Sequence, residues 1–159
     1  IGRYKRWPLM TGTGAYVLST VVNTIRGIHA HYCVELDGER IDAEQTLICI
    51  GNGRWYGGAF YPLPVARLDD GLLDVLLVRA VSRLTVVRVI GRYAKGRFAD
   101  YPQLIRYARC RRVRVVCDRE EPVNLDGELL HARDVHFELV PAAIRFFYPR
   151  GLSFAPQEG

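Results

Sequence analysis

The sequence predicts a mainly β protein, an antiparallel β-sandwich with two attached helices. Short apolar runs alternate with turns rich in glycine, proline and aspartate, and the connections between the runs are too short for crossover helices. Helical periodicity is confined to two segments. At 159 residues the chain is long enough to bury the core of one domain. We assign this domain to residues 1–150 and a C-terminal tail to residues 151–159.

The two expected helices are each preceded by a capping hydroxyl. Thr13 precedes a helix over Gly14–Arg26, and Ser82 precedes a second helix that continues to Phe98. In the second helix we expect a buried stripe formed by Leu84, Val87, Ile90, Ala94 and Phe98. The opposite face is predicted to carry the basic residues Arg88, Arg92 and Lys95.

The expected strands follow the apolar runs and the turn residues between them. Asp37-Gly38 predicts a hairpin, and Glu120-Glu121-Pro122 predicts a later turn. The strands are predicted over His29–Leu36, Arg40–Ala43, Gln45–Ile50, Leu72–Ala80, Tyr107–Asp118, Val123–Leu125, Asp134–Leu139 and Ala143–Phe147.

The stretch from Gly51 to Val75 is the most unusual part of the sequence. Four glycines within eight residues follow an apolar strand, so the backbone there bends sharply or lies close to something else. Asp69-Asp70-Gly71 then forms a turn between two apolar segments. Local chemistry leaves two interpretations open, a solvated Asp-Gly turn or a pair of carboxylates that binds a ligand.

The tetrapeptide Leu-Asp-Gly-Glu occurs twice, at Leu36–Glu39 and at Leu125–Glu128. Asp-Gly between apolar residues is a strong hairpin signal, so the tetrapeptide alone predicts a turn and no chemistry. The first copy is flanked by predicted strands and fits that interpretation fully.

Composition and charge narrow the class of protein. The chain is 49% hydrophobic and 25% charged, as in soluble globular proteins, and its net charge is +5. Between Arg83 and Arg114 there are ten basic residues and one acid, Asp100. Such a segment suits anionic lipid headgroups, nucleic acid phosphates or only a solvated face. No aromatic-and-glycine RNA signature accompanies it, so we expect no nucleic acid partner.

Cysteine and histidine spacing predicts neither a disulfide framework nor a zinc site. The four cysteines form no Cys-x-x-Cys pair, and Cys33, Cys49 and Cys117 lie in apolar runs. We therefore expect buried, reduced thiols in a cytoplasmic protein.

The ordered motifs of the chain resemble the C-terminal domain of the bacterial diacylglycerol kinase-like lipid kinases, a superfamily that includes sphingosine and ceramide kinases. The resemblance rests on Gly-Asn-Gly at 51–53, Tyr-Gly-Gly at 56–58, Pro-x-Ala at 64–66 and Asp-Asp-Gly-x-Leu-Asp-Val at 69–75. Asp-Gly-Glu at 126–128 completes the set. The resemblance covers roughly residues 11–149 and implies the C-terminal β-sandwich lobe of a two-lobe enzyme. Ala59 departs from it, because a third glycine is common there.

The resemblance implies a set of site residues. Glu128 would be the general base that accepts the proton of a lipid hydroxyl as it attacks the γ-phosphate of ATP, with Asp126 either supporting it or binding metal. A structural Mg²⁺ would be held by the backbone oxygens of Arg67 and Leu72 and by the side chain of Asp70.

The family's Gly-Gly-Asp-Gly-Thr nucleotide motif is absent from this chain, so ATP is expected to bind mainly to an N-terminal lobe. We expect the chain to be a fragment of a longer protein and inactive by itself. Its expected partners are that lobe, a lipid substrate, most simply diacylglycerol, and an anionic membrane surface at which the protein is peripheral. The choice of lipid alcohol and a homodimer stay open. The competing hypothesis is a non-catalytic β-sandwich that binds a lipid or a partner.

Overall fold

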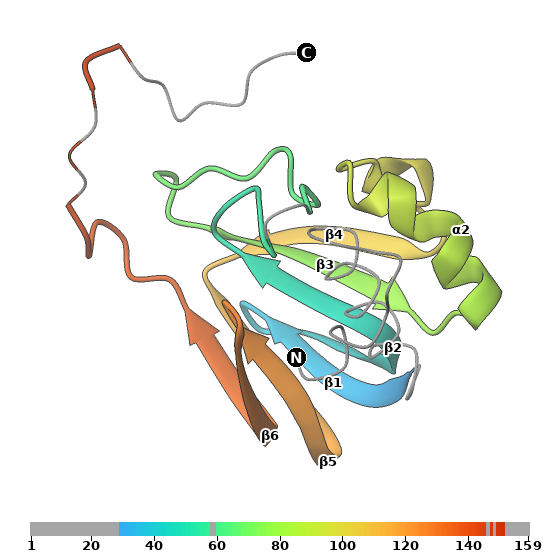
Figure 1. Ribbon diagram of the computed structural model, residues 1–159. Coiled ribbons are helices and arrows are strands. Elements are labelled where there is room, and N and C mark those ends of the chain that lie inside the picture. The colour runs from blue at the N-terminus through green and yellow to red at the C-terminus, as the bar shows by residue number, and fades with distance from the viewer. Residues whose placement is uncertain (1–28, 58–59, 146, 148, 152–159) are drawn as a thin grey trace.

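The computed structural model describes residues 29–57, 60–145, 147 and 149–151, and these form a mainly β structure (Figure 1). The elements in chain order are β1 (Ala30–Leu36), β2 (Glu39–Gly51), β3 (Leu73–Arg79), α2 (Arg83–Tyr93), the short 3₁₀ helix η2 (Phe98–Asp100), β4 (Ile105–Cys110), β5 (Arg112–Leu125) and β6 (Glu128–Glu138). The predicted antiparallel, mainly β class is confirmed. The helix predicted over Gly14–Arg26 lies outside the described residues.

The six strands form one antiparallel sheet, in the order β4-β3-β2-β1-β5-β6, which folds over into two layers at β2. The first half of β2 pairs with β1 and the second half with β3, and only Gln45 pairs with both. A bulge follows at Thr46, whose hydroxyl accepts a hydrogen bond from the backbone N–H of Val81 at 3.0 Å. A strand can change layers at such a bulge.

The connection between β4 and β5 demonstrates the folding over. β4 belongs to the layer at the end of β2, β5 belongs to the layer at its beginning, and only Arg111 separates the two strands. If β2, with its 13 residues, were straight, the end of β4 and the start of β5 would lie roughly 40 Å apart, which one linking residue cannot span. The two ends of β2 must therefore lie near each other.

The core has two parts, on the two faces of β3. Because side chains alternate along a strand, Val75 and Leu77 point between the layers whereas Leu76 points outward. Between the layers, Val75 and Leu77 pack with Val34 and Val113, and all four are at most 1% exposed. On the outer face, α2 and residues 60–66 cover Leu76 and Ile105. In Figure 1, α2 lies against β3 and β4.

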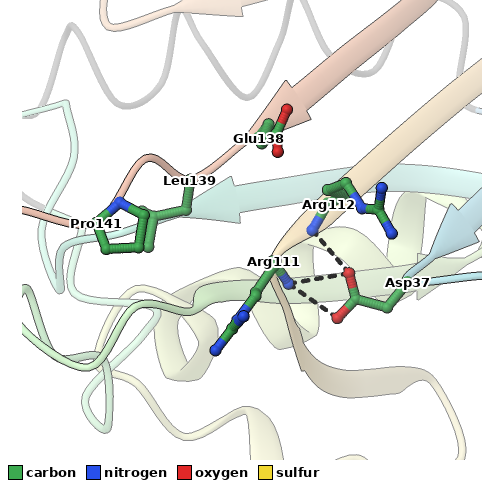
Figure 2. A pocket seen from close by; sticks show the side chains of 6 residues that line it. All are labelled: Asp37, Arg111, Arg112, Glu138, Leu139 and Pro141. Atoms are coloured by element: carbon green, nitrogen blue, oxygen red, sulfur yellow. Dashed lines mark hydrogen bonds between the residues drawn. The ribbon is translucent and has the colours of Figure 1, made fainter. Parts of the chain in front are cut away.

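The β4–β5 turn corrects one prediction. Residues 107–118 were expected to form one strand, because Arg-Cys-Arg-Arg contains neither glycine nor proline. The chain turns there because the Asp37 carboxylate accepts hydrogen bonds from the backbone N–H groups of Arg111 and Arg112, at 2.9–3.1 Å (Figure 2). This turn is held by a residue distant in sequence, so no local signal marks it.

Three further predictions change. The expected turn at Glu120-Glu121-Pro122 is wrong, because β5 continues through it with a register shift, and Pro122 pairs with His131. The strand expected over 143–147 is absent from the described residues of that range. The second helix ends at Tyr93 because Gly96 turns the chain with φ +75°, and a Cβ there would lie 2.8 Å from the Tyr61 carbonyl oxygen.

The buried stripe of this helix was also placed wrongly in part. Ile90, Ala94 and Phe98 pack on the core as expected, whereas Leu84 and Val87 are exposed. The inward positions belong to Val89 and Tyr93 instead. The four cysteines are free, as expected, and Cys110 and Cys117 are buried, whereas Cys33 and Cys49 are only partly buried, contrary to the prediction.

The repeated tetrapeptide gives a controlled test of the Asp37 contact. Asp37→Asn should lower the free energy of unfolding by about 1 kcal/mol at neutral pH, because the amide oxygen is a weaker acceptor than the carboxylate. Asp126→Asn makes the same change in the second copy of the tetrapeptide and should be neutral within about 0.5 kcal/mol. Denaturant unfolding of both variants measures the difference.

The effect of Asp37 should depend on pH. The N–H groups of Arg111 and Arg112 lower the pKa of Asp37 in the folded state. The unfolded chain then binds more protons near pH 4, so the contribution is complete above the unfolded pKa and is lost as the pH falls below about 4. Equal, pH-independent losses in the two variants would contradict this assignment.

Candidate functional site

The two Leu-Asp-Gly-Glu segments form hairpin turns with the same backbone. Leu36 pairs with Glu39, and Leu125 pairs with Glu128. Both aspartates have φ +48°, and the following glycines also have positive φ. This is the two-residue hairpin that Asp-Gly favours, so sequence and backbone do not distinguish the copies.

The surroundings of the two turns do differ. In the first copy the fold uses both acids, since Asp37 holds the β4–β5 turn and Glu39 pairs with Arg106 at 2.7 Å. In the second copy, Asp126 and Glu128 are exposed at the tip of the β5–β6 hairpin. Neither carboxylate has a hydrogen bond or ion pair to another described residue; within the turn, Asn124 Oδ1 accepts from the Gly127 N–H at 2.7 Å. The second pair of acids is therefore available for another molecule.

Asp70 lies in the turn that leads into β3, where each of its carboxylate oxygens has a partner. Oδ1 accepts a hydrogen bond from the backbone N–H of Leu72 at 3.1 Å, which closes the turn. Oδ2 forms an ion pair with Arg109 of β4. The neighbouring Asp69 pairs instead with Arg67 at 3.2 Å and is more exposed. The Asp70 carboxylate is therefore directed toward the rest of the protein, and the Asp69 carboxylate is directed toward solvent.

Asp74 is a buried acid behind this turn. It is 0% exposed, and its Oδ1 accepts a hydrogen bond from the Tyr107 hydroxyl and lies 3.5 Å from Nε of Arg109. Burial raises the pKa of Asp74, and the Tyr107 hydrogen bond and the Arg109 charge act against that rise. Burial and the bond to Asp74 raise the pKa of Tyr107. Asp74 Oδ2 has no hydrogen-bond partner.

The residues around Asp70 fit a hard cation in the type of donor they offer. A carboxylate and two backbone carbonyls, those of Arg67 and Leu72, are the oxygen ligands that Mg²⁺ prefers, and water usually completes its shell. Arg109 competes for the same carboxylate. In the described part of the chain, no group of three or more His, Cys, Asp or Glu side chains forms a metal cluster. A cation here would therefore depend on Asp70 and backbone oxygens.

The two predicted constellations are far apart. The Asp70 turn lies at the end of the sandwich where β4 turns into β5, because Cys110 pairs with Leu73. Glu128 lies beyond the other end of β5, a strand of 14 residues that spans roughly 40 Å when extended. The structure thus does not bring the acids of the two motifs together in one site.

A hollow of about 390 Å³ opens between the two layers at the end from which the β5–β6 hairpin projects. Its lining residues come from both layers and from the segment before β4: Ile41, Ala43, Gln45, Leu77, Arg79, Pro102, Gln103, Leu104 and Arg106. The walls combine apolar side chains with two arginines and two glutamines. Gln45 is 3% exposed, and its Oε1 has no hydrogen-bond partner. The hollow therefore offers both apolar and polar contacts to a small molecule.

A second hollow, of about 440 Å³, lies beside the β4–β5 turn (Figure 2). Asp37 and Glu138 line it together with Arg111, Arg112, Leu139 and Pro141. The Asp37 carboxylate in it is already bonded to the backbone N–H groups of Arg111 and Arg112 that form the turn, so this hollow is explained by the fold.

Sequence reasoning missed the Asp74, Tyr107 and Arg109 cluster. One signal was present, because Asp74 is an acid inside the otherwise apolar run Leu72–Ala80. A charged residue at a buried strand position requires a partner. Its partners come from β4, and only the β3–β4 register brings them opposite.

The two-layer antiparallel sheet defines the class of this chain, a β-sandwich-like domain. Residues 3–148 match the model of the YegS C-terminal NAD kinase beta sandwich-like domain, so the chain belongs to that family.

The individual relatives agree with the family. The chain is 38% identical over 103 residues to a protein named probable lipid kinase YegS-like from Stenotrophomonas maltophilia, covering 64% of this chain and 33% of that protein. It is 31% identical over 146 residues to a diacylglycerol kinase of Mycobacterium tuberculosis, covering 91% of this chain and 46% of that one. The crystal structure of a diacylglycerol kinase from Bacillus anthracis has the same fold, with a TM-score of 0.62, 24% identity, and coverage of 79% and 42%. The chain thus spans less than half the length of these relatives.

Among the described residues, no helix is long and apolar enough to cross a membrane.

The buried cluster predicts an energetic coupling between Asp74 and Arg109. Arg109→Met should lower the free energy of unfolding by about 1–3 kcal/mol, because it leaves the Asp74 carboxylate buried without a counter-charge. Asp74→Asn in the same molecule should recover part of that loss, because a neutral amide can still accept from Tyr107. Denaturant unfolding of the two single variants and the double variant completes the cycle. Strictly additive effects would contradict the coupling.

Proposed function

We propose that this chain is the lipid-facing lobe of an ATP-dependent lipid kinase, that its substrate is diacylglycerol, and that Glu128 is the general base. The observation that carries the proposal is the contrast between the two identical tetrapeptides. The acids of Leu36–Glu39 are used by the fold, whereas those of Leu125–Glu128 have no partner among the described residues. Acids that stabilise nothing within their own domain are suited to act on a substrate or a second lobe.

The hollow between the layers supports a lipid substrate. Leu77, Ile41 and Leu104 give it apolar walls that an acyl chain can contact. The hollow opens at the same end of the sandwich as the β5–β6 hairpin, because Tyr32 of β1 pairs with Cys117 and β5 continues beyond it. A lipid held there by its apolar part would extend its polar end toward the hairpin.

In the proposed reaction, the Glu128 carboxylate accepts the proton of the lipid hydroxyl as the hydroxyl oxygen attacks the γ-phosphate. The bond from this phosphorus to the bridging oxygen of ADP breaks, and the products are the phosphorylated lipid and ADP. Asp126, two residues away, adds negative charge that favours the proton transfer. An exposed two-residue hairpin can approach a nucleotide held by the N-terminal lobe, which we propose as the partner of this chain.

The Asp70 turn would hold Mg²⁺ in a structural role. The backbone oxygens of Arg67 and Leu72 and the Asp70 carboxylate are its proposed ligands, and the metal would neutralise negative charge at this turn. The donor types fit, and the distance to Glu128 argues that this metal does not act on the reacting atoms.

A binding module without chemistry is the second candidate, and the buried Gln45 oxygen beside the hollow between the layers is the observation that favours it. Such a module would hold a lipid alcohol and leave Glu128 without a role.

The first test of the proposal uses the repeated tetrapeptide as its own control. In the enzyme with both lobes, Glu128→Gln should lower turnover by about 10²–10⁴, because the amide keeps the shape of the base but cannot accept the proton. Glu39→Gln makes the same change at the first turn and should leave turnover unchanged. It loses one exposed ion pair with Arg106, which costs about 1 kcal/mol or less. Equal losses of turnover in the two variants would show that both turns are only structural and would favour the binding module.

The second test concerns the metal and needs this chain alone. Asp70→Asn should weaken Mg²⁺ binding roughly tenfold or more, because the site loses its only charged ligand. Asp69→Asn is the matched control, since the adjacent carboxylate is directed to Arg67. Isothermal titration calorimetry compares the two variants with the unmodified chain. Unchanged affinity in Asp70→Asn would remove Asp70 from the ligand set.

A further inference from the structure

The outward face of α2 carries large apolar side chains that the fold does not bury. Leu84 is 79% exposed and Val87 is 64% exposed, and both lie outside the core cluster beneath the helix. With the exposed Gly91 they occupy positions i, i+3 and i+7, which form one continuous stripe along a helix. A soluble surface helix normally turns such a stripe inward, and here the inward positions are filled by other residues.

Basic residues flank this stripe on both sides. At 100° per residue, Arg83 lies on one side of it and Arg88 on the other, and Lys95 follows two residues after the end of the helix. All three side chains are exposed, and none pairs with an acid of the described residues. The nearest acid along the chain, Asp100, pairs with Arg97 at 2.9 Å and contacts Arg92. The face is therefore positive, with an apolar centre.

We infer that this face of α2 is an interfacial membrane-binding surface for anionic lipid headgroups. A helix with an apolar stripe between cations lies in the plane of the bilayer interface, with the apolar side chains among the acyl chains and the cations at the phosphates. Charge complementarity selects the partner, since phosphates match the cations and the acyl region matches Leu84 and Val87. A nucleic acid would match only the cations.

The position of α2 in the chain indicates what the membrane contact would do for the protein. This part of the inference rests on the proposed lipid-kinase function. α2 lies between β3 and β4, and the residues at the two ends of that connection, Arg79 and Leu104, line the hollow between the layers. A bilayer in contact with α2 therefore lies near the mouth of the hollow. A lipid could then enter the hollow from the membrane with little exposure to water.

Vesicle binding tests the inference through two kinds of variant. The unmodified chain should co-sediment with vesicles of phosphatidylglycerol and phosphatidylcholine in equal parts, and much less with phosphatidylcholine alone. Arg83→Gln, Arg88→Gln and Lys95→Gln together should weaken binding roughly a hundredfold at low salt. Leu84→Gln with Val87→Gln should weaken it roughly tenfold, and this loss should persist at high salt because it is not electrostatic.

Matched controls lie elsewhere on the chain. Arg111→Gln, Arg133→Gln and Arg145→Gln together remove the same net charge from exposed positions. Val140→Gln with Ile144→Gln remove two apolar side chains of similar exposure, 67% and 72%. Both controls should bind the mixed vesicles nearly as the unmodified chain does. Thermal melting of every variant verifies that it is folded.

A fluorescent reporter separates insertion from surface attraction. In Leu84→Trp, the added emission should shift to shorter wavelength with the mixed vesicles and stay unchanged with an oligonucleotide. Wild-type binding by the apolar variant, equal binding to both kinds of vesicle, or loss of binding in the controls would each overturn the inference. None of these measurements contains ATP or diacylglycerol, so their failure would leave the kinase proposal intact, and a failure of the Glu128 test would leave this inference intact.

Discussion

The architecture depends on the folding of β2 back on itself. One strand supplies an edge to each layer, so the side chains of β1 and β5 can pack against those of β3 and β4 as a closed core. The extra residue at the bulge has a specific partner, because the Thr46 hydroxyl accepts from Val81 just after β3. A hydrogen bond from the Ala80 N–H to the Glu44 carbonyl fixes the same corner at 3.1 Å. Without this corner the apolar faces would be exposed on an open sheet.

The other end of the sandwich is closed by a charged contact in place of a favourable turn sequence. Asp37 sits in a hairpin between β1 and β2, yet its carboxylate organises the turn from β4 to β5. Both turns are thereby fixed in one place, and the two layers cannot slide past each other. The Asp37 side chain thus stabilises a turn of the kind that a local glycine or proline usually stabilises.

The sequence correctly predicted hairpin turns and a helix start whose determinants are local, and it missed a turn whose determinant is distant in sequence. Asp-Gly predicted both hairpins, and Ser82 predicted the start of α2, where its hydroxyl accepts from Thr85 at 3.3 Å. The β4–β5 turn was missed because its acceptor is more than seventy residues away.

The face of α2 was misjudged for a related reason. An apolar stripe at Leu84 and Val87 satisfies helical periodicity, but another stripe, through Val89 and Tyr93, does so as well. Periodicity cannot decide between two stripes when tertiary packing has room for only one. The Asp-Gly-Glu motif at 126–128 was singled out as a candidate site only through the family resemblance, since the first copy has the same local sequence and backbone.

The comparison of the two tetrapeptides shows how a single turn motif can support different roles. Backbone geometry is closely similar in the two copies, so the difference must lie in what surrounds them. The first turn is packed against its own domain, and its acids are neutralised by Arg106 and by backbone N–H groups. The second turn extends away from the domain on long strands with a register shift in β5, which leaves its carboxylates without partners among the described residues. An acid in that position contributes little to folding and is accessible to a substrate or a second lobe, as the proposed role requires.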